Sequence, residues 1–289
     1  MSPNSLNIEQ MKNDYPFLKK LWDLYDSFDN PVKGDYEGVY DRICNLATTG
    51  LNNDKGTYND ICMKLIRNLD PYCKGGKKCI SDSHRCINVN NWLYNTIEKK
   101  YLNNKSFIDR IFELSRNIRS GINNLGCYYY SYDTQYHEPI NIIYLKMFDD
   151  NIDAIKSSLE NESEPNYSSA KRYLCKFVQI YKQMYISYCS GTQAKTDKED
   201  RTCGELNTLS RSYSMFHSSN TKISPKIPSL EATDNDLLDI CPSIQAEHSL
   251  QASVYGHSGS STSKIPATIG TMAGVSSVFA LLYKVNTKL

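Results

Sequence analysis

The sequence predicts an all-α fold: a cysteine-containing helical bundle, then a disordered stalk and one C-terminal transmembrane helix. Three observations predict it. Apolar residues recur at helical spacing along most of residues 1–190. Residues 191–264 are rich in Ser, Thr, Asn, Lys and Pro and carry few apolar side chains, which is typical of a flexible linker. Residues 265–283 then form an uncharged stretch between Lys264 and Lys284.

Seven stripes of apolar residues indicate seven helices in the first domain. They lie at 17–28, 36–47, 57–69, 88–101, 106–122, 139–159 and 168–188. Thr57-x-x-Asp60 and Ser106-x-x-Asp109 match capping patterns that satisfy free backbone N–H groups. Pro139 occupies a favoured first helical position. Few segments alternate with period two and none pairs through a hairpin turn, so we predict a single all-α domain at 1–190.

The chain has ten cysteines, and an even number at irregular spacing predicts disulfides and an oxidising compartment. They are Cys44, Cys62, Cys73, Cys79, Cys86, Cys127, Cys175, Cys189, Cys203 and Cys241. The pairing cannot be read from sequence, although the group from Cys62 to Cys86 favours some local bridges. No pair has zinc-knuckle spacing, and Cys79, His84 and Cys86 lack a matching second half, so we expect no metal and no cofactor. The alternative is a set of reduced, buried cysteines in a cytosolic protein.

Tyrosine is enriched, with 22 Tyr against 8 Phe and 2 Trp. The densest run is Cys127-Tyr-Tyr-Tyr-Ser-Tyr132. Tyrosine combines an apolar ring with a polar tip, so the run fits either core packing or a recognition surface. The formal net charge of +1 gives no electrostatic reason to expect nucleic acid as a partner.

The polar region and the C-terminus complete the domain predictions. We expect a stalk at 191–264, with Cys203 and Cys241 attaching part of it to the helical body. A helix over 265–283 would reach roughly 28 Å, close to the bilayer core, so we predict a transmembrane helix at 265–284. A buried core helix or an amphipathic surface helix is the alternative. Lys284 and Lys288 favour a short cytoplasmic tail at 285–289, which leaves the N-terminal domain outside.

Small residues in the predicted membrane helix bear on self-association. Gly270 and Gly274 are four apart, a spacing that lets two helices approach closely in lipid, although such residues are also common in membrane helices generally. Residues 1–20 are polar, and we expect no signal peptide there.

Catalytic motifs are absent from the sequence. The five histidines are scattered, and no G-x-S-x-G, phosphate-binding loop, H-E-x-x-H or G-x-G-x-x-G occurs. A cysteine–histidine pair that meets only in the fold stays open. We expect the protein not to be an enzyme.

The chain resembles the interspersed-repeat (PIR) variant surface proteins of malaria parasites, VIR type. The stretches that carry the resemblance are YNDICMKLIRNLDPYC at 58–73, CINVNNWLY at 86–94 and FALLYK at 279–284. The order of segments is also similar. The tail departs from the family, because VNTKL at 285–289 lacks the usual Thr-Pro pair. The parasite export motif is absent too, since RNLDP at 67–71 has proline in its last position.

This resemblance implies a membrane-anchored variant antigen at the surface of the infected red cell or in exported membranes. Its implied roles are immune evasion and adhesion, with host-cell receptors or antibodies as partners and with no catalysis. The family provides no binding residues to transfer, so the ligand-binding residues are unknown. The alternative function is an intracellular, membrane-tethered helical scaffold with reduced cysteines.

Overall fold

The structure is a computed structural model, and it describes residues 7–34, 36–50, 55–69, 83–100, 104–120, 126–191 and 194–242. These residues form helices and no strand, which confirms the all-α prediction for this part of the chain. The elements are α1 (Ile8–Asp14), η1 (Pro16–Leu18), α2 (Lys19–Asp29), α3 (Glu37–Ala47), α4 (Lys55–Leu69), α5 (Ser83–Lys100), α6 (Lys105–Ser120), α7 (Tyr132–Gln135), α8 (Pro139–Asp150), α9 (Ile152–Leu159), α10 (Tyr167–Tyr188), α11 (Asp197–Ser219), η3 (Ser224–Lys226) and α12 (Asp234–Ile240).

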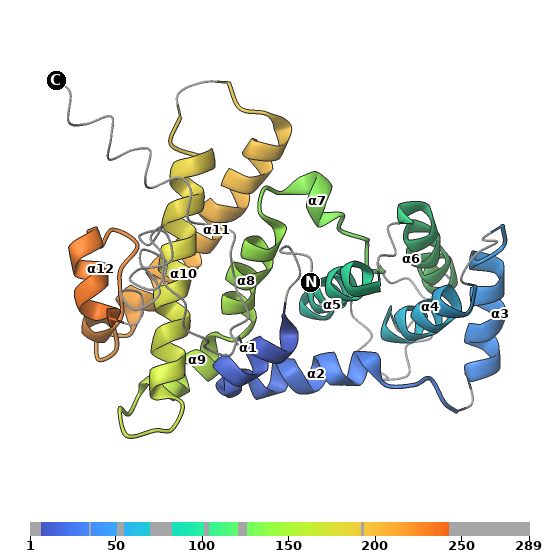
Figure 1. Cartoon of the computed structure of the whole chain (residues 1–289), viewed down its shortest axis with the longest axis horizontal. Coiled ribbons are helices and arrows are strands. Elements are labelled where there is room, and N and C mark those ends of the chain that lie inside the picture. The colour runs from blue at the N-terminus through green and yellow to red at the C-terminus, as the bar shows by residue number, and fades with distance from the viewer. Residues whose placement is uncertain are drawn as a thin grey trace, which may run out of the picture.

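The helices gather in two groups along the long axis of the molecule (Figure 1). The first group is α3 to α6, in which α4 packs against α3, α5 and α6. The second group is α8 to α12, in which α10 packs against α8, α9 and α11. Helix α2 lies along one side and contacts both α4 and α5 (Figure 1). One continuous hydrophobic core runs through both groups.

Aromatic rings fill the core of the second group. Phe148 from α8 lies 5.1 Å from Phe177 of α10 and 5.4 Å from Tyr213 of α11, measured between ring centroids. Phe177 and Tyr213 stack at 4.9 Å with an interplanar angle of 12°. Such ring pairs stabilise the packing beyond the area that they bury. The Tyr213 hydroxyl donates to the carbonyl of Pro228 at 2.6 Å, so its polar tip is satisfied inside the core.

Much of the tyrosine enrichment is core packing. Tyr144 of α8 donates to the Tyr15 hydroxyl at 3.0 Å, and Tyr173 of α10 donates to the Tyr144 carbonyl at 3.0 Å. Burial raises the pKa of Tyr144 and of Tyr173 well above the ordinary tyrosine value. These hydroxyls therefore act as neutral hydrogen-bonding groups that join α8 and α10 to Tyr15, which directly follows α1.

Four disulfides join helices or segments that lie next to one another in the described residues. They are Cys44–Cys62, Cys86–Cys127, Cys175–Cys241 and Cys189–Cys203. Local pairing within the group from Cys62 to Cys86 does not occur for its two described members, because Cys62 bonds to α3 and Cys86 bonds to the segment before α7. The spatial neighbours, and not the sequence neighbours, decide these pairs. Cys73 and Cys79 lie outside the described residues.

The boundary predicted at residue 190 is wrong, because the folded domain continues at least to residue 242. Helix α11 packs against α10 and α8 and buries Leu206, Leu209 and Tyr213, among others. Helix α12 is attached through Cys241 to Cys175 of α10. The expectation that Cys203 and Cys241 attach part of the polar region to the helical body agrees with the structure. The remainder of the predicted stalk, 243–264, lies outside the described residues.

The predicted helix at 139–159 is two helices in the structure. Helix α8 ends at Asp150, and the side chain of Asn151 donates back to the Met147 carbonyl at 2.8 Å. The Asn151 carbonyl then accepts from Ile155 at the start of α9. A residue whose side chain competes for backbone groups favours such a break.

The predicted transmembrane helix at 265–284, its packing residues Gly270 and Gly274, and the tail at 285–289 lie outside the described residues. None of the helices that the structure describes combines the length and the apolar character needed to cross a bilayer.

Candidate functional site

The tyrosine segment, residues 127–132, is the candidate contact surface. Up to Ser131 it is a non-helical stretch that connects the region after α6 to the start of α7. Its first residue, Cys127, is bonded to Cys86 near the start of α5. Its last, Tyr132, is buried and donates to Asn91 of α5 at 2.6 Å. Both ends of the segment are therefore fixed to α5.

The middle of the segment is held by a single side chain. The amide of Asn90, which is 1% exposed, donates to the Tyr128 carbonyl at 3.0 Å and accepts from the Tyr130 N–H at 2.8 Å. The Asn90 amide thereby pairs with the backbone as a neighbouring strand would. Since a side-chain amide supplies both a donor and an acceptor, this one residue satisfies two backbone groups.

Neighbouring side chains in an extended segment point to opposite sides. Tyr129 points inward and packs against Phe112 of α6, with ring centroids 5.6 Å apart. Burial, followed by the carboxylates of Asp109 and Asp133, raises the pKa of Tyr129. Tyr128 and Tyr130 point outward and are 55% and 39% exposed. The segment therefore anchors one ring and presents two.

A cation lies on the outer face of the segment. The guanidinium of Arg116 in α6 sits 4.6 Å from the centroid of the Tyr128 ring, a cation–π geometry, and Arg116 also donates to the Cys127 carbonyl at 3.4 Å. Gly126 is required here, because a Cβ at that position would lie 2.8 Å from Cγ of Arg116. The exposed Tyr128 ring is thus positioned before any partner arrives.

Rigid tyrosines suit recognition because they offer a large amphipathic area and lose little side-chain entropy on contact. The arrangement of Asn90, the Cys86–Cys127 bridge and Arg116 limits the freedom of the segment further. From the sequence, the tyrosine run fits either core packing or surface display. The structure divides it, with Tyr129 and Tyr132 packed and Tyr128 and Tyr130 exposed.

A second apolar surface lies on the other helix group. Tyr185 and Ile186, at the end of α10, are 38% and 58% exposed. They border a shallow hollow that Ser210 of α11 and Leu230 also line. This surface is not visible in the sequence, because its residues come from three separate segments.

The histidines and cysteines form no nucleophilic pair in the part of the chain that the structure describes. Its eight described cysteines are all in disulfides. His84 contacts the carboxylate of Asp150 at 2.5 Å, and His137 stacks on Tyr188 at 4.4 Å. No group of ligating side chains that could hold a metal ion occurs within the same residues. His248 and His257 lie outside them.

Comparisons with known proteins agree with the resemblance seen in the sequence. No curated protein and no solved structure matches the chain. A sequence model described as Plasmodium vivax Vir protein matches residues 19–215, which is more than half of the chain and spans α2 to most of α11. On this match the chain belongs to the Plasmodium vivax Vir protein family.

Proposed function

We propose that this protein is a membrane-anchored variant surface antigen of the infected red cell, with no catalytic activity, and that its helical domain faces outside. Membership of the Vir family supports the antigen role. The four disulfides of the described residues support an oxidising location for the helical domain. The uncharged stretch at 265–283 supports the anchor, since its length matches a bilayer core.

The same disulfides weigh against the alternative function, an intracellular scaffold with reduced cysteines. Cys44 and Cys62 are both 0% exposed and bonded to each other. A buried pair of this kind favours a protein that folds under oxidising conditions. We therefore keep surface display as the proposal.

Within this function, the tyrosine segment is the proposed contact surface for a host receptor or an antibody. The observation that carries the proposal is that Asn90 holds the backbone at Tyr128 and Tyr130 while the rings of these two residues face outward. A partner that meets this surface finds two aromatic rings already ordered, so little conformational entropy is lost on binding.

A paired substitution tests the contact surface. The Tyr128→Ser and Tyr130→Ser double variant removes two exposed rings, and Tyr185→Ser is the control because Tyr185, on the other helix group, is about as exposed as Tyr130. Binding of the full chain to host endothelial cells and to antibodies from infected hosts is measured by flow cytometry. We expect the double variant to lose most of its binding while the control keeps it. Equal binding by wild type and the double variant would assign the contact to another surface.

A further inference from the structure

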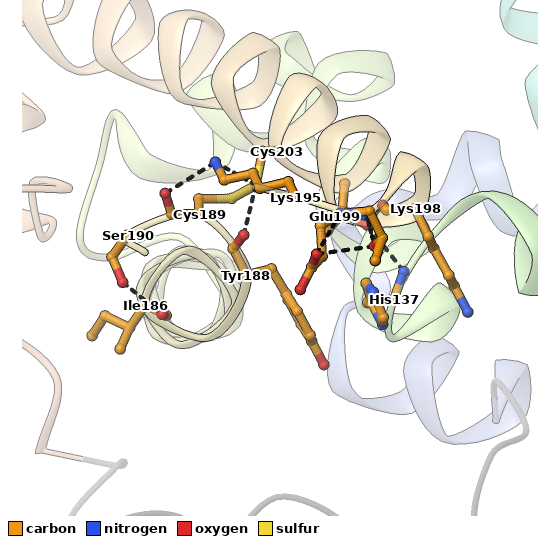
Figure 2. Close-up of a disulfide and its surroundings, with 11 residues drawn as sticks. His137, Ile186, Tyr188, Cys189, Ser190, Lys195, Lys198, Glu199 and Cys203 are labelled. Carbon is orange, nitrogen blue, oxygen red and sulfur yellow. Dashed lines mark hydrogen bonds between the residues drawn. A yellow bond between two sulfur atoms is a disulfide. The ribbon is translucent and has the colours of Figure 1, made fainter. Parts of the chain in front are cut away.

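The Cys189–Cys203 disulfide is one of two described bridges that contain a partly exposed cysteine. It joins the end of α10 to the second turn of α11 (Figure 2). Cys189 is partly exposed, whereas Cys175 and Cys241 are 2% and 1% exposed. Exchange requires that a thiolate reach a sulfur directly, so an external thiol can attack Cys189 but is excluded from the buried bridges.

An ammonium group lies beside the same disulfide. Nζ of Lys195 is 3.7 Å from Sγ of Cys203 and donates to the Cys189 carbonyl at 3.1 Å. Figure 2 shows the Lys195 side chain running next to the sulfur–sulfur bond. The carbonyl contact holds the ammonium in place, and a neighbouring cation stabilises a cysteine in its thiolate form. The ammonium therefore favours Cys203 as the leaving sulfur, and it acts against the Tyr188 carbonyl oxygen, which lies 3.1 Å from the same sulfur.

The Cys86–Cys127 bridge is a natural comparison. Cys86 is also partly exposed, so accessibility to an external thiol does not by itself distinguish the two bridges. Its nearby cation, Arg116, donates to the Cys127 carbonyl and lies over the Tyr128 ring. Lys195 instead places its ammonium against the disulfide sulfur itself, at Sγ of Cys203. The two bridges thus differ mainly in stabilisation of the leaving thiolate.

From this geometry we propose that Cys189–Cys203 is a thiol-exchange site that accepts small thiols of the glutathione class. The thiolate attacks Sγ of Cys189 and forms a mixed disulfide with it, while the Cys189–Cys203 bond breaks. The electron pair of that bond stays on Sγ of Cys203, which leaves as a thiolate next to Lys195. No other oxidant or reductant takes part. The leaving group departs faster when its thiolate is stabilised.

Opening this bridge leaves the bundle in place. Helices α10 and α11 remain packed through Phe177 and Tyr213, whose rings stack at 4.9 Å. The Cys175–Cys241 bridge still joins α10 to the end of α12. The product is a folded domain with a small thiol attached at the end of α10. The Cys189–Cys203 site is separate from the tyrosine segment, because it follows α7 in the chain whereas the tyrosine segment leads into α7.

Timed exchange on the oxidised full chain tests the proposal. Glutathione is added, samples are quenched with acid and alkylated, and each cysteine peptide is measured by mass spectrometry. We expect glutathione on Cys189 and a free thiol on Cys203 before any other described bridge opens. In Lys195→Met the rate at this bridge falls by roughly threefold or more. Lys198→Met, a lysine of the same turn region, leaves the rate unchanged, and Lys195→Arg restores it.

Two results would overturn the proposal: Cys86–Cys127 opening as fast as Cys189–Cys203, or an unchanged exchange rate in Lys195→Met. Salt provides a second measurement that needs no variant. Raising the ionic strength from about 0.05 M to about 0.5 M screens the ammonium and is expected to slow exchange at Cys189–Cys203 relative to Cys86–Cys127. An equal salt response of both bridges also contradicts the proposed role of Lys195.

Discussion

The guanidinium of Arg67 in α4 donates to the Phe28 carbonyl at the end of α2, with Nη2 and the oxygen 2.7 Å apart. The same group donates to the carbonyls of Ser27 at 3.0 Å and of Asn30 at 2.5 Å. The last carbonyls of a helix have no partner within it, so a side chain from α4 completes α2. Burial lowers the pKa of Arg67 from its ordinary value. A guanidinium stays protonated in proteins, so Arg67 acts only as a donor. This contact fixes α2 against the first helix group.

Replacing Arg67 with Met is expected to destabilise the fold by roughly 1.5–3 kcal/mol, because its charge-assisted hydrogen bonds to the carbonyls at the end of α2 are lost. Urea unfolding followed by circular dichroism measures the change. Arg211→Met is the control, since Arg211 is exposed and donates within its own helix. A loss at Arg67 no larger than at Arg211 would show that α2 does not depend on this contact.

Removing the Cys175–Cys241 bridge by two alanine substitutions is expected to cost about 4 kcal/mol, since it closes a loop with a sequence separation of 66. Removing Cys189–Cys203, with a separation of 14, is expected to cost about 3 kcal/mol. Unfolding midpoints give the ranking. Limited proteolysis should also cut between α11 and α12 in the first variant and not in the second. The reverse ranking would mean that α12 is held by other contacts.

The helix stripes were predictable from sequence because side chains such as Ile61, Leu65 and Ile66 recur at helical spacing and are fully buried. Helix α11 was missed, since its exposed face is polar and its apolar residues are sparse. One signal could have revealed it. Thr196 and Glu199 form a capping box at its start. Leu206, Leu209 and Tyr213 then follow at helical spacing.

The contact surface was only half predictable. The density of tyrosines around 127–132 is visible in the sequence, but the role of Asn90 is not, because it depends on α5 lying beside that segment. The disulfide pairing was unpredictable for the same reason. Cys175 and Cys241 meet only after α12 folds back onto α10.

Replacing Asn90 with Ala is expected to cost about 1–3 kcal/mol, because it leaves backbone groups of the tyrosine segment without partners. Hydrogen exchange within the tyrosine segment tests the role of Asn90 more specifically than the free energy of unfolding does. Hydrogen exchange at the Tyr130 amide, which donates to Asn90 in the native fold, should become faster. Asn45→Ala is the control, because Asn45 is exposed and its side chain donates to Asp41 within α3. Unchanged exchange at Tyr130 would contradict the proposed fixing of the segment.

Asp149 gives a prediction about pH. Burial raises the pKa of this carboxyl, although the hydroxyl of Ser212 donates to it and partly offsets the shift. The folded state therefore binds the proton more tightly than the unfolded state does. Stability therefore falls as the pH rises from the ordinary value of 3.8 through the raised pKa.

Asp149→Asn removes this loss of stability and keeps an oxygen that can accept from Ser212. We expect a higher thermal midpoint than wild type at pH 7, with the difference shrinking as the pH is lowered towards 4. Glu113→Gln, at an exposed position of α6, serves as the control and is expected to show little change. A lower midpoint for Asp149→Asn at pH 7 would mean that the ionised carboxylate is stabilising.

The central claim is that the helical domain is displayed outside a membrane in oxidised form. The most direct measurement is differential alkylation and peptide mapping of the chain isolated from infected cells, combined with protease treatment of intact cells. We predict that Cys44, Cys62, Cys175 and Cys241 are blocked in the pairs seen here and that external protease cleaves the domain. Freely labelled thiols at these four positions, on a domain that protease does not reach, would contradict surface display and support the intracellular scaffold.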